Sequence, residues 1–127
     1  MMVHQNQMAE FTLHASEKLA SPYAGQRLEA QWTAPDGSTG TVRGFWAGGD
    51  CWKIRYSSPV TGIHTLRTRS LRPDQGLDGQ TLQVEVAAYT GDNPLYQHGG
   101  VCRKGDERFL RHQDGTPFFY LADTWWM

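Results

Sequence analysis

Apolar and polar residues alternate most clearly over residues 51–56, where Trp52, Ile54 and Tyr56 fall on one face of an extended strand. A strand with one apolar face needs a second layer to cover that face. A Gly-rich turn at residues 47–50 precedes the strand, and a corner at residues 58–62 follows it. We therefore predict that this strand lies at the centre of a small antiparallel β-sandwich.

Weaker alternation on both sides predicts the other strands of the same sandwich. They are expected at residues 10–14, 27–33, 39–45, 63–68 and 81–86. The side chains expected to face inward are Phe11, Leu13, Leu28, Ala30, Trp32, His64, Leu66, Thr68, Leu82, Val84 and Val86. Residues 10–88 show no convincing helical period, and turn signals such as Pro35-Asp36-Gly37 separate the strands. About seven short strands of this kind are typical of an all-β sandwich of immunoglobulin or fibronectin type.

The pattern changes at Tyr89, and residues 89–100 are predicted to be a linker. Beyond it, a turn signal at Asp114-Gly115 separates two apolar arms, residues 108–112 and 117–122, which predicts a hairpin. The second arm is apolar on both faces, like a strand buried from both sides in a parallel sheet or barrel. Such a strand has no neighbours in this sequence, so we expect residues 101–127 to be a hairpin and the first strand of a truncated barrel. Residues 1–9 are expected to be a flexible N-terminus.

Composition and charge narrow the class of protein. A chain of 127 residues suits one domain plus part of another. The net charge of −1 argues against a nucleic-acid-binding protein, and the Arg-rich run at residues 67–72 is interpreted as a solvated strand edge. No stretch reaches the ~20 apolar residues of a membrane helix, and the N-terminus lacks a secretion signal, which indicates the cytoplasm unless a signal was removed. Cys51 and Cys102 are either bridged or unrelated, and two unrelated thiols are favoured.

Three stretches of the chain resemble a known family. Residues 44–55, Gly-Phe-Trp-Ala-Gly-Gly-Asp-Cys-Trp-Lys-Ile-Arg, resemble the signature of an N-terminal β-sandwich domain of unknown function that precedes the catalytic barrel of apiosidase-like putative glycoside hydrolases. Residues 91–99 resemble the connector that follows this domain, and residues 114–125 resemble the first strand of the (β/α)₈ barrel. The resemblance covers nearly the whole chain from Phe11 onward. The chain departs from the family at Ala47, where an acidic residue is usual, and at His64, where an aromatic residue is usual.

The resemblance implies where a substrate would lie in a full-length protein. Asp123, Trp125 and Trp126 follow the barrel-like strand, at the end where such barrels place their active sites, so they are candidate substrate-binding residues. Asp123 is explained equally well as a structural turn cap. Glycoside hydrolysis normally needs two carboxylates and this strand end has one, so we expect no catalytic residue in this chain. Trp46, beside the Gly-rich turn, is a candidate for stacking on a sugar ring, whereas Trp52 is expected in the core.

These observations lead to one leading hypothesis and two alternatives. The leading one is a non-catalytic accessory domain of a glycoside hydrolase, which docks against the catalytic barrel or holds the enzyme near a polysaccharide or oligosaccharide. The first alternative is a free-standing carbohydrate-binding module that uses Trp46. The second is a protein–protein docking domain, with self-association through residues 118–127. The five histidines show no metal-site spacing and no phosphate-binding loop occurs, so neither a metal nor a cofactor is expected, and neither nucleic acid nor a membrane is an expected partner.

Overall fold

The computed structural model describes residues 1–18 and 20–125 of the chain. Contacts between residues divide the chain into two compact units, one ending at Ala88 and the other beginning at Tyr89. Each unit has its own sheet, with seven strands in the first and three in the second among the described residues.

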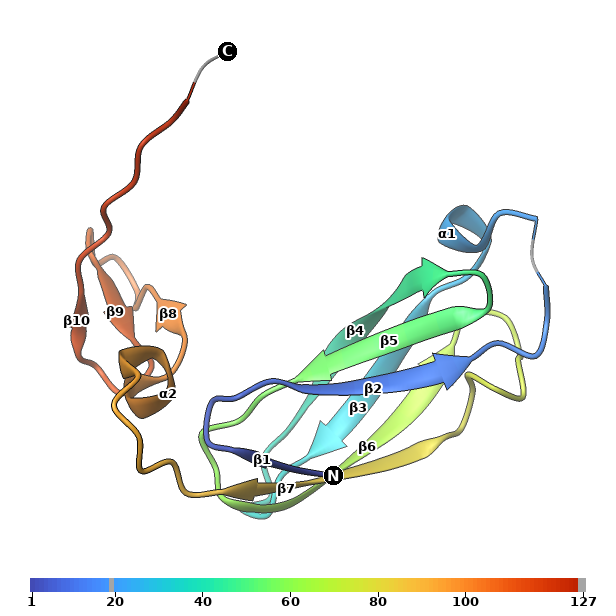
Figure 1. Cartoon of the computed structure of the whole chain (residues 1–127), viewed down its shortest axis with the longest axis horizontal. Coiled ribbons are helices and arrows are strands. Elements are labelled where there is room, and N and C mark those ends of the chain that lie inside the picture. The colour runs from blue at the N-terminus through green and yellow to red at the C-terminus, as the bar shows by residue number, and fades with distance from the viewer. Residues whose placement is uncertain (19, 126–127) are drawn as a thin grey trace. The chain divides into compact units, whose positions relative to one another are not determined.

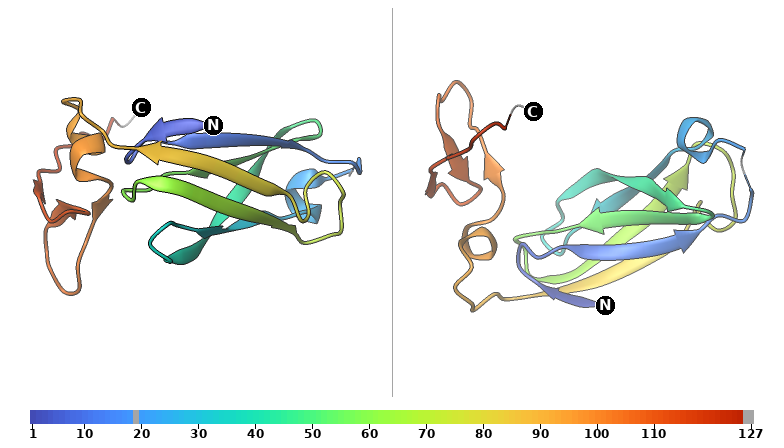
Figure 2. Two further views of the ribbon diagram at one scale, coloured as in Figure 1. Left: turned by 90° about the horizontal axis from the view of Figure 1, so that it is seen from below. Right: turned by 45° about the horizontal axis from the view of Figure 1, so that its top comes forward.

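The first unit is a seven-stranded sheet that curls into a nearly closed barrel (Figures 1 and 2). Its elements are β1 (Met2–His4), β2 (Ala9–His14), α1 (Pro22–Gly25), β3 (Leu28–Thr33), β4 (Thr39–Gly48), β5 (Cys51–Tyr56), β6 (Gly62–Ser70) and β7 (Thr81–Ala87). The strand order is β1-β7-β6-β3-β4-β5-β2, and every neighbouring pair is antiparallel except β1 and β7. The predicted all-β class is therefore confirmed, with the two layers formed by one continuous sheet.

Strand β4 joins the two layers of this curled sheet. Residues 39–43 of β4 pair with β3, and residues 44–48 pair with β5. At the change of partner, a Cβ atom on Gly44 would lie 2.8 Å from Leu28 Cδ2 and 3.0 Å from the Lys53 carbonyl oxygen. Only glycine leaves room for the neighbouring strands to approach so closely. Gly44 therefore allows β4 to pass from one layer to the other.

Two sequence interpretations are corrected in this unit. Residues 2–4 were expected within a flexible segment, but they form β1, which runs parallel to β7. Three residues are too few to show an alternation, so the sequence carries no signal for this strand. The Arg-rich run at residues 67–72 was interpreted as a strand edge, but β6 lies between β7 and β3 and is a central strand. Its arginines point to solvent because they lie on the outer face of the sheet.

Most of the hydrophobic core consists of side chains that the alternation assigned to the inner face, and Ala9 and Leu77, which lie outside the predicted strands, complete it. Leu28, Ala30, Ile54 and Leu66 have no exposed surface, and Trp52 is 4% exposed. The half-buried Trp32 and Leu82 pack against this cluster. The predicted burial of Trp52 is therefore confirmed.

His64 occupies the position where the resembled family usually has an aromatic residue, and its ring is fully buried. His64 Nε2 donates to the carbonyl oxygen of Val60 at 2.8 Å, because a carbonyl can only accept. In the neutral ring Nδ1 then accepts from the hydroxyl of Tyr56, at 2.8 Å. The two rings are also in contact, with centroids 5.6 Å apart. The imidazole thus fills an aromatic site and satisfies two buried polar groups.

The second unit contains α2 (Pro94–His98) and a small sheet of β8 (Val101–Cys102), β9 (Leu110–His112) and β10 (Pro117–Phe118). β9 and β10 form the predicted hairpin, with shorter arms than the pattern indicated. Residues 89–100 were predicted to be a linker, yet part of this segment packs within the unit. His98 Nδ1 lies 2.7 Å from Asp114 Oδ2, and His112 Nδ1 donates to the Gly99 carbonyl at 2.7 Å.

Residues 119–125 continue from β10 without regular secondary structure. The strand predicted over residues 117–122 ends at Phe118, and β10 pairs with β9 among the residues that the structure describes. The apolar side chains that follow are exposed: Phe119 by 84%, Leu121 by 84% and Trp125 by 88%. The assignment of this segment to a barrel strand stays a prediction. Cys51 on β5 and Cys102 on β8 are both free thiols.

Candidate functional site

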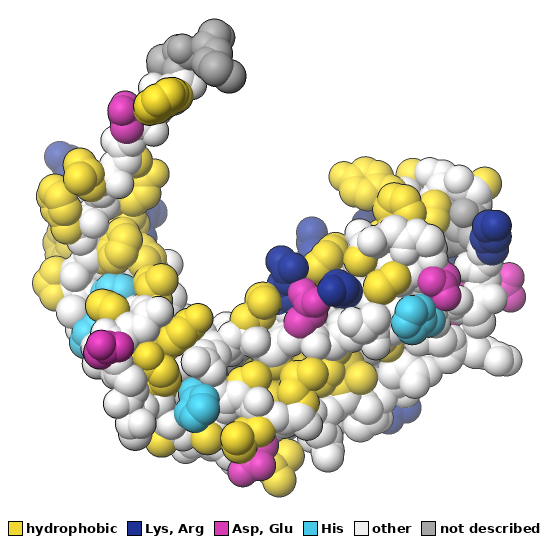
Figure 3. Space-filling model, in the orientation of Figure 1, with side chains coloured by type: hydrophobic (Ala, Val, Ile, Leu, Met, Phe, Trp, Pro, Cys, Tyr) yellow, Lys and Arg dark blue, Asp and Glu magenta, His cyan; other side chains and the backbone are white. Residues whose placement is uncertain are grey.

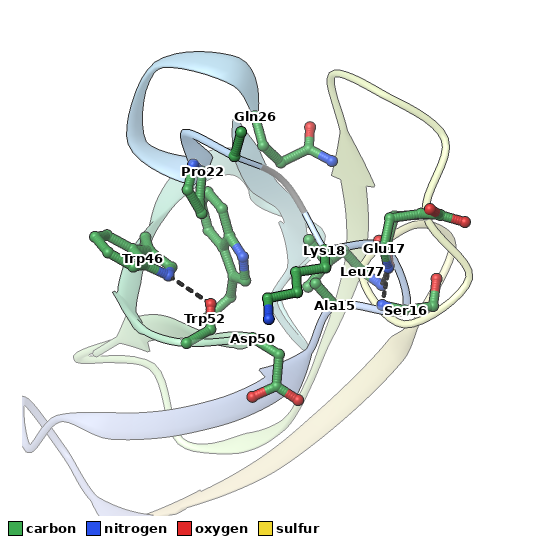
Figure 4. A pocket seen from close by; sticks show the side chains of 13 residues that line it. Ala15, Ser16, Glu17, Lys18, Pro22, Gln26, Trp46, Asp50, Trp52 and Leu77 are labelled. Atoms are coloured by element: carbon green, nitrogen blue, oxygen red, sulfur yellow. Dashed lines mark hydrogen bonds between the residues drawn. The ribbon is translucent and has the colours of Figure 1, made fainter.

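A pocket of about 580 Å³ lies at the end of the first unit where β4 turns into β5 (Figure 4). It is bounded by the segment between β2 and α1, the turn between β4 and β5, and the loop between β6 and β7. The described residues that line it are Ala15, Ser16, Glu17, Lys18, Ala20, Pro22, Gln26, Trp46, Gly49, Asp50, Trp52, Asp74 and Leu77. Two tryptophans from paired strands therefore meet at one open end of the sheet.

Trp46 and Trp52 are directly opposite each other on β4 and β5. Trp52 is buried, whereas Trp46, at the end of β4, is 38% exposed. The indole Nε1 of Trp46 donates to the carbonyl oxygen of Gly49 at 2.9 Å, so its polar atom is satisfied within the turn (Figure 4). A bulge shifts the register between Trp46 and Gly48, and Gly48 and Gly49 have φ angles of 108° and 58°. These glycines permit the tight turn that holds the Trp46 ring at the rim.

Asp74 fixes the wall of the pocket. Its carboxylate accepts hydrogen bonds from the backbone N–H groups of Ser16 (3.0 Å), Glu17 (2.9 Å), Gly76 (2.9 Å) and Leu77 (3.1 Å). Burial by itself raises the pKa of Asp74, but the backbone N–H groups outweigh this effect and hold its pKa below the usual value. The carboxylate therefore ties the segment after β2 to the loop after β6. Gly76 allows this approach, since a Cβ there would lie 1.8 Å from the His14 carbonyl oxygen.

The remaining charged groups of the pocket lie nearer to solvent. Asp50 Oδ2 lies 3.3 Å from His14 Nδ1, and both side chains are about two-thirds exposed, at 65% and 64%. In Figure 4 the carboxylates of Asp50 and Glu17 point in different directions, and the side chain of Lys18 extends between them. Both oxygens of the third carboxylate, that of Asp74, are occupied by backbone donors. The arrangement is suited to holding a ligand against the exposed indole of Trp46.

A second groove of about 490 Å³ continues the pocket on the other side of Trp46. The two share Gln26, Trp46 and Trp52. The other residues of the second groove are Tyr23, Ala24, Arg27, Leu28, Arg43, Gly44, Phe45 and Leu71. Gln26 is buried and holds the α1 segment in place, because its Nε2 donates to the Arg72 carbonyl at 3.1 Å and its Oε1 accepts from the Arg72 N–H at 2.9 Å. Trp46 thus stands between two continuous depressions.

The sequence had singled out Trp46, and the structure places it at this rim. Ala47, where the resembled family has an acidic residue, lies in the adjoining bulge and is exposed. Sequence reasoning missed the contribution of Asp74 and of Tyr23. Asp74-Gln75-Gly76 lies between the strands predicted at residues 63–68 and 81–86, and an Asp two residues before a Gly is a signal for a carboxylate that binds backbone N–H groups. Tyr23 lies between the strands predicted at residues 10–14 and 27–33 and carries no such signal.

The other predicted site residues lie in the second unit. Asp123 and Trp125 are exposed and lie in the irregular segment 119–125. Trp126 lies outside the described residues. The role of these three residues in substrate binding stays a prediction. Within residues 1–18 and 20–125, no group of three or more His, Cys, Asp or Glu side chains is arranged to hold a metal ion. The described helices are also too short to cross a membrane.

Fold and site together define a small, nearly all-β domain with an aromatic residue exposed beside a pocket. More particularly, the chain belongs to the family described as Domain of unknown function (DUF5060), whose model matches residues 2–71, more than half of the chain. The resemblance to a domain of unknown function is therefore confirmed. A search of curated proteins gave no match.

Two solved structures share the fold. A putative glycoside hydrolase from Bacteroides vulgatus ATCC 8482 is 24% identical, with a TM-score of 0.72 over 93% of this chain and 21% of that protein. The Lin-41 filamin domain is 16% identical, with a TM-score of 0.50 over 67% of this chain and 81% of that domain. The chain thus spans about a fifth of the length of the putative glycoside hydrolase that it matches. At these identities the comparisons establish the fold alone.

Proposed function

We propose that this chain is a non-catalytic accessory domain of a glycoside hydrolase and that it holds glycan at the rim formed by Trp46. Two findings support the proposal: the family is a domain of unknown function, and the fold covers about a fifth of a putative glycoside hydrolase. The observation that carries it is the indole of Trp46, which is exposed between two grooves and has its N–H satisfied by Gly49.

The geometry of Trp46 suits a sugar because an indole face can stack on the C–H face of a pyranose ring. A tryptophan side chain presents at most about 250 Å², and Trp46 is 38% exposed. A ligand that covers the remaining surface therefore removes about 90 Å² from water, which is worth about 2 kcal/mol, or about thirtyfold in affinity. The turn holds the ring in place before binding, so little conformational entropy is lost.

Catalysis, in this proposal, belongs to the rest of the enzyme. Glycoside hydrolysis requires an acid and a nucleophile or base. Of the carboxylates at the pocket, that of Asp74 is fully engaged by backbone donors, and those of Asp50 and Glu17 point in different directions. The catalytic barrel would be the partner of this domain, and the apolar side chains among residues 119–125 would contact it. Asp123, Trp125 and Trp126 would then lie near its substrate.

The test is a titration of the chain with gluco-, xylo- and manno-oligosaccharides and with uronate oligosaccharides, monitored by tryptophan fluorescence and NMR. We expect binding that perturbs the Trp46 indole resonance and that weakens about thirtyfold in Trp46→Ala. Phe109→Ala is the control, since Phe109 is an exposed aromatic residue of the second unit with no proposed part in glycan binding. Equal binding by Trp46→Ala and the original chain would contradict the proposed platform. Clear glycosidase turnover by this chain would contradict its non-catalytic role.

The exposed segment 119–125 supports a second candidate function, protein–protein docking or self-association. Phe119, Leu121 and Trp125 are each more than four-fifths exposed, and hydrophobic side chains are prominent on the visible face of the second unit (Figure 3). Large exposed apolar patches commonly mark an interface. Size-exclusion chromatography of the whole chain and of a chain that ends at Ala88 tests this function. A larger species that the shorter chain lacks would support it, and the same oligomeric state in both would count against it.

A further inference from the structure

We infer that the glycan recognised by this domain carries carboxylate groups, because a strip of unpaired arginines leads away from Trp46. The inference rests on the proposed function and adds the chemical class of the ligand. The strip is formed by Arg27, Arg43, Arg67 and Arg69, and it lies on the outer face of β3, β4 and β6 and on the residue before β3.

The arginines are brought together by strand pairing. Glu29 on β3 is in register with Arg43 on β4 and with Arg69 on β6, so these three side chains form one row across the sheet. Gln31 is in register with Arg67, and it forms part of the next row on the same face. Directly opposite side chains are about 5 Å apart at Cβ, and rows on one face of a strand are separated by about 7 Å. The arginine side chains are therefore close enough together for one oligosaccharide of a few sugars to contact several of them.

The strip is continuous with the groove beside Trp46. That groove is lined by Arg27, Arg43 and Leu71. A smaller depression of about 280 Å³ shares Arg27 and Leu71 with it and adds Arg69. A third, of about 260 Å³, shares Arg69 and continues to Arg67. One path thus leads from the exposed indole along four cationic side chains.

The charges of this strip are not neutralised within the protein. Among residues 1–18 and 20–125, ion pairs form between Glu10 and both Lys53 and Arg55 and between Glu107 and Arg111, but none involves the four arginines of the strip. Glu29 is the one carboxylate among the residues that line the three grooves. Since the whole chain has a net charge of −1, this face is basic relative to the rest. Guanidinium groups bind carboxylates through two parallel hydrogen bonds, so a chain of uronate sugars fits the strip.

The experiment uses the whole chain and three defined probes: oligogalacturonate, oligoguluronate and oligoglucuronate of six sugars, each beside its carboxyl-reduced counterpart. The reduced counterpart has the same rings without the charge. We expect at least one uronate to bind at least tenfold more tightly than its reduced form at low salt, with a smaller ratio in 0.5 M NaCl because salt screens exposed charges. The double variant Arg43→Gln/Arg69→Gln should weaken uronate binding about fivefold and leave the reduced form unaffected.

Arg103→Gln/Arg108→Gln is the control, because it removes the same charge from exposed positions in the second unit. An equal loss in this control, or tighter binding of a thymidine 20-mer than of every uronate, would overturn the inference. So would equal affinity for uronate and reduced forms. If reduced glycans bound as tightly as uronates and Trp46→Ala abolished that binding, the proposed function would be supported and the inferred preference for acidic glycan would be contradicted. If no glycan bound, both would fall.

Discussion

Removing the carboxylate of Asp74 should loosen the wall of the Trp46 pocket. Asp74→Ala deletes the acceptor of four backbone hydrogen bonds. The Leu77 N–H keeps a partner, because it is also 3.1 Å from the backbone carbonyl of Asp74. Ser16 and Glu17 are exposed, so water can replace the carboxylate at their N–H groups. The Gly76 N–H would lose its partner in a half-buried position.

These contributions set the expected loss of stability. An unpartnered buried donor costs about 1–3 kcal/mol, and each rehydrated bond costs about 0.5–1.5 kcal/mol. We therefore expect Asp74→Ala to lower the free energy of unfolding by about 3 kcal/mol. Asp74→Asn should lose about 1–2 kcal/mol, because it retains one acceptor oxygen but directs an amide donor towards one backbone N–H. Asp78→Ala is the control, since the side chain of Asp78 accepts one backbone bond, from Ser70, at an exposed site.

Urea unfolding of the three variants, monitored by tryptophan fluorescence, gives these differences. Amide exchange at Ser16 and Glu17 reports on the wall itself and should accelerate in both Asp74 variants. The pKa of Asp74 is lowered in the fold, so its contribution is present above the unfolded pKa of about 3.9 and is lost as pH falls through the folded pKa. The gap between the original chain and Asp74→Asn should therefore close only below about pH 4. Equal losses in Asp74→Ala and Asp78→Ala, or unchanged exchange at Ser16 and Glu17, would refute this reasoning.

Three further perturbations follow from the structure. His64→Phe should lower stability by about 2 kcal/mol because it removes the hydrogen-bond partner of both the Tyr56 hydroxyl and the Val60 carbonyl, and adding Tyr56→Phe should restore part of that loss; an additive double mutant in urea unfolding would contradict this coupling. Gly76→Ala should destabilise the first unit, since its Cβ would lie 1.8 Å from the His14 carbonyl oxygen; an unchanged midpoint of thermal unfolding would contradict it. Backbone and side-chain hydrogen bonds lower the pKa of Asp114 to about 2. The carboxylate of Asp114 should therefore stabilise the fold fully above its unfolded pKa, and this contribution should disappear as pH falls through about 2. An NMR titration that gave a pKa near 4 for the Asp114 carboxyl would contradict this prediction.

Strand positions and inward faces were predictable because the core is built from alternation within single strands. Leu28, Ile54, Leu66 and Val84 occur at positions where a period of two is visible in the sequence, and all four are buried. The exposure of Trp46 was suggested by the glycines beside it. Alternation and neighbouring glycines are local features of the sequence, and they can be interpreted without knowing which strands pair.

The parts that sequence could not predict depend on contacts between distant residues. β1 exists because Met2–His4 finds the free edge of β7, which lies about 80 residues later in the chain. Asp74 binds Ser16 and Glu17 across sequence separations of 58 and 57 residues. Arg43 and Arg69 lie on either side of Glu29 only because both of their strands pair with β3. A pattern within one strand contains no information on these pairings, so the run at residues 67–72 could be mistaken for an edge.

The position of the candidate site follows from the path of β4. Because this strand leaves β3 and joins β5 at Gly44, its last residues pair with β5 and end at the turn that leads into β5. Trp46 keeps the inward orientation of the alternation but lies at the open end, whereas its partner Trp52 remains in the core. A larger side chain at position 44 would clash with Leu28 and with the backbone of Lys53, and would hinder the passage of β4 from β3 to β5. The exposed indole is therefore a consequence of how the sheet closes, and any family member with glycine there and an aromatic residue two positions later should present the same rim.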